Sequence, residues 1–376
     1  MKKSLIALAV LAASGAAMAQ SSVTLFGVVD ATIRYTDGGN GSRWQMANSG
    51  YNSSRLGFRG TEDLGGGLTA SFWLEAGVGN DSGTGVVSST NNQVGGTNTA
   101  PTGSQGLTFN RRSTVSLAGS WGEVRLGRDF VPYFWNTTIF DPFGTNGVGA
   151  VSNMTLAGLS ALNILGGGAA VNITAAGVRA SNSIGYIMPN IAGFYGQAML
   201  AMGENNDKTV AGLNNPDKSN GNVGSVRVGY ANGPFDIAVG WGATTFAPSQ
   251  QYGVTNIGAS WNFGVAKALF LWNQESADTL TNTKLRSNTY MLGATMPMGA
   301  GELKGSYTWG NSTNDDLDGS QSAIGYVYNL SKRTALYTTY SYINNDGNAS
   351  VYAMDAANAA LRKSQWGLDF GVTHRF

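Results

Sequence analysis

The hydrophobic pattern of this chain has a period of two residues, and the segment 364–376 shows it most clearly. Apolar and aromatic residues alternate there with small or charged ones along the sequence SQWGLDFGVTHRF. One face carries Trp366, Leu368, Phe370, Val372, His374 and Phe376, and the other carries Gly367, Asp369, Gly371, Thr373 and Arg375. This alternation is typical of a membrane barrel with lipid outside and water inside, although a strand of a soluble sandwich alternates in the same way.

Two further segments repeat the alternation, and two do not. Residues 23–36 place Leu25, Val29, Ile33 and Tyr35 opposite Thr24, Asp30, Thr32 and Arg34. Residues 302–309 place Leu303, Tyr307 and Trp309 opposite Glu302, Lys304, Ser306 and Thr308. Segments 266–276 and 333–343 carry apolar residues on both faces, so the pattern leaves their orientation open.

The connections between the alternating segments follow a regular rhythm of short and long. Short turns are expected near residues 63–67, 119–122, 188–193, 231–234, 263–266, 297–301 and 330–333. Longer polar stretches lie near 37–51, 80–107, 130–177, 204–222, 246–252, 277–287, 311–320 and 344–362. Fifteen connections join sixteen strands, with both ends of the chain on the short-turn rim. We therefore predict an all-β fold, a transmembrane antiparallel β-barrel of 16 strands.

The N-terminal segment predicts export. Residues 1–19 place Lys2 and Lys3 before an apolar stretch that ends in Ala17, Met18 and Ala19, the pattern of a cleaved secretory signal. No apolar run after residue 20 approaches the 18 residues of a membrane helix. Without a linker or a change of composition, residues 20–376 are expected to form one barrel domain.

Composition narrows the function classes. Without the two lysines of the signal, 21 basic residues face 22 acidic ones, so nucleic acid is not an expected partner. The chain has 54 Gly, 8 Pro and only 12% charged residues, which favours many strands and turns over a soluble enzyme. The absence of cysteine means that no disulfide contributes to stability.

The stretch from Phe130 to Val178 is unusual because Asp141 is its only charged residue. It is far longer than the roughly 12–15 residues beyond which an unstructured connection needs a functional reason. We predict that this third long loop, about 130–177, folds into the lumen and forms a constriction. Its aromatic start is expected to pack against the wall, and MTLAGLSALNIL is expected to form a short helix.

Several motifs resemble the trimeric general-diffusion porins of Gram-negative outer membranes, particularly the betaproteobacterial type. SVTLFGVVDATI resembles the first strand of that family, and SRLGFRGTEDLGGGLTASFWLE resembles the second and third. FNRRSTVSLAG, GEVRLGRD and NSIGYIMPNIAGFYGQ resemble the next four, so the match covers essentially the whole mature chain. The chain departs from the family at Gly185, where a basic residue is usual, and in a longer second loop.

This resemblance implies a homotrimer in the outer membrane, in contact with lipid and lipopolysaccharide. It also implies a third loop that narrows the pore for small ionic solutes. The ending GVTHRF resembles the family's C-terminal assembly signal, which would engage the barrel-assembly machinery through Phe370, Val372 and Phe376.

Charges on the inward faces are the candidate selectivity residues. The basic ones are Arg34, Arg55, Arg59, Arg112, Arg128 and Arg179, and the acidic ones are Asp30, Glu75, Asp141 and Asp369. Arg55, Arg59 and Arg112 match the basic ladder of the resembled family. Because a constriction focuses the electric field, we expect anion preference. Alternatively, half of these arginines pair with carboxylates and only hold the wall together. Arg111 and Arg112 are not expected to point inward together unless a bulge intervenes.

Other functions are less well supported by the residues. His374 is the only histidine and lies two residues from the end, so neither a multi-histidine metal site nor a serine-histidine-acid device is expected. NSTNDDLDG, with Asp315, Asp316 and Asp318, fits a solvated loop better than a calcium loop. No cofactor is expected. A substrate-specific channel, a structural or adhesin barrel and a membrane-embedded enzyme remain as alternatives.

Overall fold

The computed structural model describes residues 22–86, 88, 92, 106–155, 177–204, 218–246, 250–278, 284–312, 317–347, 352–360 and 362–376. The predicted signal, residues 1–19, lies outside the described residues. Eighteen strands form one sheet. They are β1 (Ser22–Gly38), β2 (Gly41–Asn48), β3 (Arg55–Gly65), β4 (Leu68–Gly79), β5 (Thr84–Gly85), β6 (Arg112–Gly119), β7 (Gly122–Phe130), β8 (Arg179–Ile187), β9 (Phe194–Ala201), β10 (Val223–Asn232), β11 (Phe235–Phe246), β12 (Gln250–Asn262), β13 (Lys267–Asp278), β14 (Lys284–Met298), β15 (Gly301–Ser312), β16 (Gly319–Asn329), β17 (Thr334–Asn345) and β18 (Gln365–Arg375).

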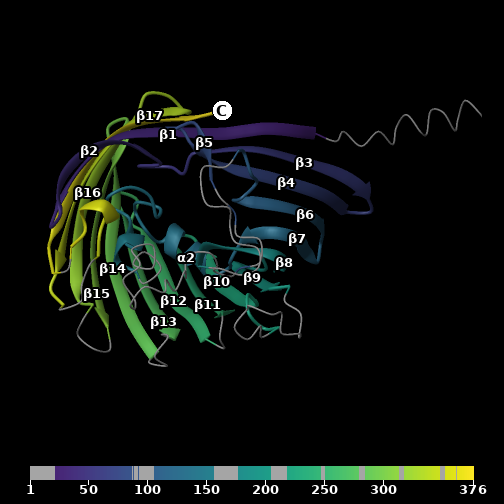
Figure 1. Cartoon of the computed structure of the whole chain (residues 1–376). Helices are drawn as coiled ribbons and strands as arrows, with labels where there is room; N and C mark the ends of the chain where they lie inside the picture. The colour runs from purple at the N-terminus through teal and green to yellow at the C-terminus, as the bar shows by residue number, and fades with distance from the viewer. Residues whose placement is uncertain are drawn as a thin grey trace, which may run out of the picture.

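These strands occupy sixteen positions around a closed barrel. β2 and β3 pair with successive parts of β1 and therefore share one position, and β5 is a two-residue pairing with the end of β4. The first and last strands pair with each other, with Val29 opposite His374, which closes the sheet. Figure 1 shows the strands wrapped around a central space that holds the helix α2 (Phe134–Ile139). The predicted sixteen-stranded antiparallel barrel is confirmed.

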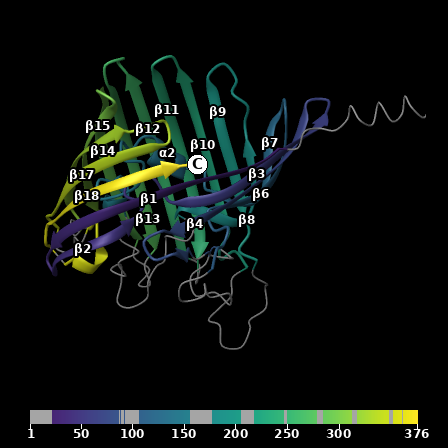
Figure 2. The same cartoon turned by 90° about the horizontal axis from the view of Figure 1, so that it is seen from above.

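Short turns and long connections alternate as the sequence predicts. All seven expected short turns join consecutive strands, from β3–β4 to β16–β17, and several lie side by side at one end of the barrel (Figure 2). The first long loop is expected near residues 37–51, and these bounds are wrong because most of the segment is strand. A tight turn ends β1 at Gly38 and β2 starts at Gly41, whose φ of 106° favours glycine. The break in the sheet falls later, at residues 49–54.

The predicted faces agree with the exposure of the side chains. On β18, Phe370 and Val372 are 49% and 43% exposed on the outside, whereas Asp369 is fully buried inside. On β1, Val29 and Ile33 face outward and Asp30 inward in the same way. None of the helices within the described residues is long and apolar enough to cross a membrane.

The two ambiguous segments carry apolar residues inside because a neighbouring segment covers them. On β13, Leu271 faces inward and packs with Met291 and with Val151 of the short 3-10 helix η1 (Val151–Met154). On β17, Tyr337 faces inward, packs against Tyr51 and donates its hydroxyl to Asp30. Alternation with a period of two residues arises where one face of a strand meets water. At these two strands the inner face is covered by protein instead, so the alternation is lost.

The segment after β7 enters the barrel and lies on the far inner wall. α2 contacts β11, β12 and β13, and η1 contacts β15 and β16. The Phe140 ring occupies the space beside Gly258, where an added Cβ would lie 1.9 Å from the ring, and Tyr133 fills the space beside Gly242. Glycine on the wall is therefore what allows the loop to approach so closely. The predicted inward third loop is confirmed up to Thr155, and residues 156–176, with most of MTLAGLSALNIL, lie outside the described residues.

The last residue is held within the sheet. The backbone N–H and carbonyl oxygen of Phe376 each form a 3.1 Å hydrogen bond with Gly27. The Phe376 ring covers Gly27 so closely that an added Cβ would lie 2.4 Å from it. The assignment of Phe370, Val372 and Phe376 to an assembly signal stays a prediction.

Candidate functional site

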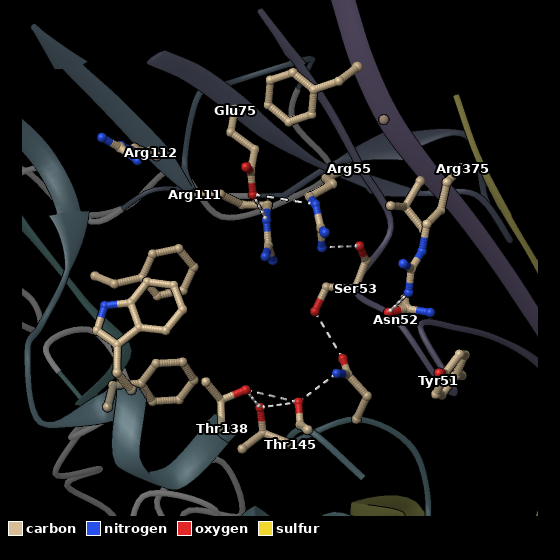
Figure 3. Close-up of a pocket in the computed structure, with 18 of the residues that line it drawn as sticks. Tyr51, Asn52, Ser53, Arg55, Glu75, Arg111, Arg112, Thr138, Thr145 and Arg375 are labelled. Carbon is tan, nitrogen blue, oxygen red and sulfur yellow. Dashed lines mark hydrogen bonds and ion pairs between the residues drawn. The ribbon is translucent and has the colours of Figure 1, made fainter. Parts of the chain in front are cut away.

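A cavity of about 750 Å³ separates the inward loop from the wall formed by β1, β3, β4, β6 and the start of β8. Figure 3 shows the arginines of that wall on one side and Thr138 and Thr145 of the loop on the other. Two acidic side chains, Glu75 and Asp141, line the cavity. Seven basic side chains line it: Arg55, Arg59, Arg111, Arg112, Arg179, Lys304 and Arg375. Basic residues therefore dominate the lining of the cavity between the inward loop and the wall.

Glu75 is shared between two of these arginines. Its Oε1 lies 2.6 Å from Nε of Arg111 and 3.9 Å from Nε of Arg55 (Figure 3). Its Oε2 accepts a 3.1 Å hydrogen bond from Nε1 of Trp73. One carboxylate therefore faces two guanidinium groups, which leaves a positive excess at this point of the wall.

Arg111 and Arg112 both line the cavity, and the expectation that they need a bulge to do so is wrong. β6 begins only at Arg112, whose Nε bonds Thr114 Oγ1 on the inward face at 3.1 Å. Arg111 precedes the strand, and its N–H donates to the carbonyl oxygen of Glu75 at 3.0 Å. Outside the strand the alternation no longer applies, so neighbouring side chains can share one side.

Trp73 organises the next two basic side chains. The Arg112 guanidinium lies 4.7 Å from its ring centre and that of Arg59 lies 5.2 Å from it. Arg112 also lies 3.6 Å from the Asp129 carboxylate, whereas Arg59 forms no ion pair within the described residues. The predicted Arg55, Arg59 and Arg112 are thus brought together in one cavity.

Arg128 and Arg179 lie near each other but differ in access to the lumen. Arg128 lies at an irregularity between Gly127 and Asp129 and is not part of the cavity lining. Its Nε bonds the carbonyl oxygen of Asn110 at 2.5 Å, and its Nη1 bonds Ser181 Oγ at 2.8 Å. Arg179 lines the cavity with its guanidinium 4.2 Å from the centre of the Phe130 ring.

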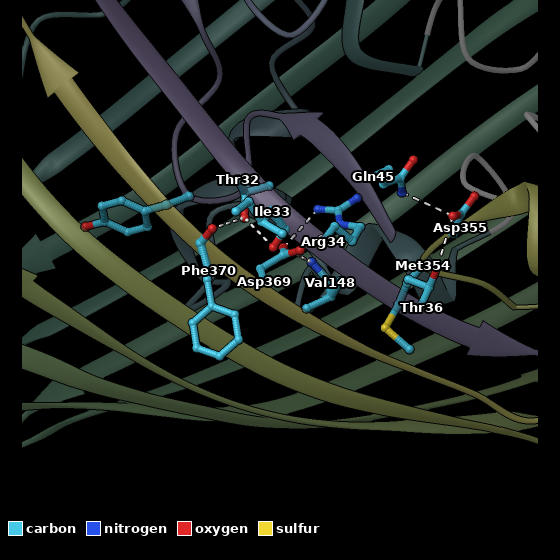
Figure 4. A network of polar contacts seen from close by, with 12 residues as sticks. Thr32, Ile33, Arg34, Thr36, Gln45, Val148, Met354, Asp355, Asp369 and Phe370 are labelled. Carbon is cyan, nitrogen blue, oxygen red and sulfur yellow. Dashed lines mark hydrogen bonds and ion pairs between the residues drawn. The ribbon is translucent and has the colours of Figure 1, made fainter. Parts of the chain in front are cut away.

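Arg34 and Asp369, both predicted at the constriction, pair with each other instead of lining the cavity. Nε and Nη2 of Arg34 bond the two carboxylate oxygens of Asp369 at 2.7 and 2.9 Å. Asp369 also accepts the backbone N–H of Val148 at 3.1 Å, so the pair holds the inward loop to the first and last strands (Figure 4). Their opposite charges cancel within one buried contact.

Asp30 is also a structural residue rather than a charge in the lumen. It is fully buried and accepts the N–H groups of Gly50 at 2.9 Å and Asn52 at 2.8 Å, and the hydroxyl of Tyr337 at 2.6 Å. These bonds bend residues 49–54 inward. Ser53 of this segment then donates to Asn146 of the loop at 2.9 Å, which links the wall to the loop beside the cavity (Figure 3).

Asp141 borders the cavity, but its carboxylate is directed into the loop itself. It is 5% exposed and accepts the backbone N–H groups of Phe143, Thr145 and Val151 at 2.9 to 3.0 Å. Burial raises the pKa of the Asp141 carboxyl above its ordinary value, against the opposite effect of these three donors. Its main visible role is therefore to fix the fold of the loop.

Three basic lining residues were absent from the sequence-based site: Arg111, Lys304 and Arg375. Lys304 and Arg375 lie on predicted inward faces, so the alternation contained the signal for both. Nζ of Lys304 donates to the carbonyl oxygen of Pro142 at 3.0 Å. Arg375 donates to Asn52 at 3.2 Å. Nothing in the pattern distinguished Arg111 from an outward residue.

The described residues contain no cluster of three or more side chains suited to a metal ion. Asp318 accepts the N–H of Ser312, and Asp315 and Asp316 lie outside the described residues. His374 is exposed and lies 2.9 Å from Thr334 Oγ1.

A closed barrel with an inward loop and a basic cavity is the architecture of a diffusion channel, and comparison with known proteins identifies its family. The model of the Gram-negative porin family matches residues 5–348. The chain belongs to the Gram-negative porin family. It is a porin of the outer membrane that forms a water-filled channel for passive diffusion.

Relatives of this porin match over its whole length. Outer membrane porin protein 32 of Delftia acidovorans is 40% identical over 394 residues, with 100% of both chains covered. An outer membrane porin protein of Bordetella pertussis is 30% identical over 436 residues, again with 100% of both covered. The solved structure of an anion-selective porin from Comamonas acidovorans aligns with a TM-score of 0.77 and 36% identity, covering 95% of this chain and 100% of the other.

Proposed function

We propose that this porin prefers anions and that the basic cavity sets the preference. The observation that carries the proposal is that seven basic and only two acidic side chains line the cavity. One of those acids, Glu75, faces two arginines, and the carboxylate of the other, Asp141, is turned into the loop. Fixed charge of one sign at a narrow passage with low-dielectric walls raises the local concentration of the opposite ion. The similarity to an anion-selective porin supports the same reading.

The test is reconstitution of the purified porin in a planar lipid bilayer under a potassium chloride gradient. We expect the conductance to rise in steps as single channels insert. We also expect the sign of the reversal potential to show that chloride is more permeable than potassium. A reversal potential of the opposite sign would contradict the preference, and the absence of any stepwise conductance would contradict the channel itself.

We further propose that the barrel assembles as a homotrimer and contacts lipid and lipopolysaccharide on its remaining outer surface. Large apolar side chains on the outer face of the first strands support such an interface, among them Ile33, Trp44 and Met46, which are 51%, 65% and 55% exposed. Phe376 and the strand before it remain the proposed signal for the barrel-assembly machinery. The mass of the detergent-solubilised, unheated protein distinguishes a trimer from a monomer.

A further inference from the structure

The cavity has an aromatic side as well as a basic one. Phe130, Phe134 and Trp135 all line it and are only half-buried. The neighbouring Tyr133 is 4% exposed and packs into the wall with Val254 and Tyr252, as the sequence predicts for this segment. Phe134 also packs against this buried cluster, although it is itself only partly buried. The expected packing is therefore confirmed for Tyr133 and Phe134, and all three lining rings still keep part of their surface exposed. Aromatic surface that stays partly exposed inside a charged aqueous channel calls for a binding explanation.

The three rings form one continuous surface that meets the arginines. The centres of Phe130 and Phe134 are 5.8 Å apart with nearly parallel planes, and Trp135 lies 5.1 Å from Phe130. Arg179 already stacks on Phe130 at 4.2 Å, and the Arg111 guanidinium lies 5.8 Å from the same ring. A molecule in contact with both surfaces therefore meets an aromatic face and a guanidinium group within one cavity.

The hydrogen-bonding state of Arg179 adds a second indication. Its Nε is buried and has no hydrogen-bond partner among the residues that the structure describes. Within the described residues Arg179 forms no ion pair, unlike Arg34, which has a carboxylate of its own. A buried polar group without a partner carries a free-energy cost that a bound anion beside this guanidinium would lower by attraction.

From this juxtaposition we propose that the cavity transiently binds planar aromatic carboxylates on their way through the channel. The ring stacks on the exposed parts of Trp135 and Phe134, and the carboxylate lies against Arg111 and Arg179. An aliphatic carboxylate of the same size makes the same ion contact but has no flat π-face to stack. Binding is weak and reversible, as conduction requires. This inference rests on the proposed anion preference and adds a substrate class to it.

The experiment compares benzoate with cyclohexanecarboxylate, which has the same number of non-hydrogen atoms and the same charge. Each is added to wild-type channels in a planar bilayer, and the concentration that halves the chloride current is measured. Because aromatic contacts add a modest preference beyond area, we expect benzoate to reach half-block at about two- to tenfold lower concentration. Equal half-blocking concentrations in the wild-type channel would overturn the proposal without any variant.

Substitution locates the preference within the cavity. In Trp135→Ala, and more strongly in the double variant with Phe134→Ala, we expect the ratio of the two concentrations to fall to about one. The matched control is Ile139→Ala on the same helix, at a position that is 39% exposed and does not line the cavity, and it should keep the wild-type ratio. Persistence of the full ratio in the double variant would contradict this binding site.

Failure of this inference is distinguishable from failure of the proposed function. The reversal potential of the wild-type channel in a chloride gradient is recorded in the same bilayers before any organic acid is added. Anion preference with equal block by the two acids rejects the aromatic site alone. Cation preference rejects the proposed function.

Discussion

Two groups of inward arginines on this barrel differ in how many carboxylates they have. Arg34, on the first strand, has a carboxylate of its own. Two of its N–H groups donate to the carboxylate oxygens of Asp369, at 2.7 and 2.9 Å. Arg55 and Arg111 share the single carboxylate of Glu75, and Arg179 has no ion pair within the described residues. The first group is charge-neutral and structural, whereas the second leaves positive charge facing the lumen.

The inward position of a charge does not by itself determine its function. Both groups satisfy the same alternation of inward and outward side chains, and both appear basic in the sequence. Only the pairing across strands separates a contact that holds the loop from a charge that acts on a passing ion. The opposite charges of a buried ion pair largely cancel, so the pair produces little electric field in the lumen. One carboxylate shared by two arginines leaves an excess of positive charge.

The largest effect should come from breaking the neutral pair. Asp369→Asn leaves Arg34, whose side chain is 13% exposed, without its carboxylate and also weakens the contact with Val148. Loss of one partner of a buried ion pair costs about 3–5 kcal/mol. We expect the folded barrel to unfold at a clearly lower urea concentration in detergent micelles, as measured by the heat-modifiable shift of its electrophoretic band.

The matched double variant sharpens this expectation. Arg34→Gln combined with Asp369→Asn removes both charges, so no unpaired charge is left buried. Its free energy of unfolding should therefore exceed the value that adding the two single effects gives. Simple additivity would mean that the pair contributes no coupling and that the loop is held by other contacts.

A smaller effect is expected at Asp141, the only charge of the inward loop. Asp141→Asn replaces a carboxylate that accepts three backbone N–H groups, which should cost about 1–3 kcal/mol. Since burial raises the pKa of this carboxyl, the folded state binds its proton more tightly than the unfolded chain. Its contribution to stability is therefore greatest at low pH and declines as the pH rises through the folded pKa.

The measurement for Asp141 is the difference in urea midpoint between the wild type and Asp141→Asn as a function of pH. This difference should narrow as the pH rises through the acidic range. A difference that widens with pH would mean that the three N–H donors outweigh burial and lower the pKa. A large gain in anion preference in the same variant would instead place the carboxylate in the lumen, as the sequence alone suggests.

Much of this architecture follows from local sequence. The seven short turns and the inward face of the end strands depend only on turn residues and on period-two alternation, and both are read within a few residues. The inward loop follows from its length and low charge. The inward orientation of an apolar residue such as Leu271 cannot be predicted in this way, because the residue that packs on it, Val151, is distant in sequence.

The pairing of the candidate residues does not follow from local sequence. Arg34 meets Asp369 only because closure of the barrel sets β1 against β18 in one register. Arg111 enters the cavity because it precedes β6, which begins at Arg112. The ends of a strand are the least certain part of any prediction from alternating residues. Asp141 turns away from the lumen because its own loop supplies the donors. Each outcome depends on contacts that a single strand does not contain.

We propose that the shared and unpaired arginines, and not the neutral pair, set ion selectivity. The test is the reversal potential in a potassium chloride gradient for two variants that each carry two substitutions. Arg111→Gln with Arg179→Gln should move the reversal potential strongly towards the value of a non-selective pore, while Arg34→Gln with Asp369→Asn should leave it near that of the wild type. A larger shift in the second variant than in the first would mean that the neutral pair, and not the shared arginines, sets the selectivity.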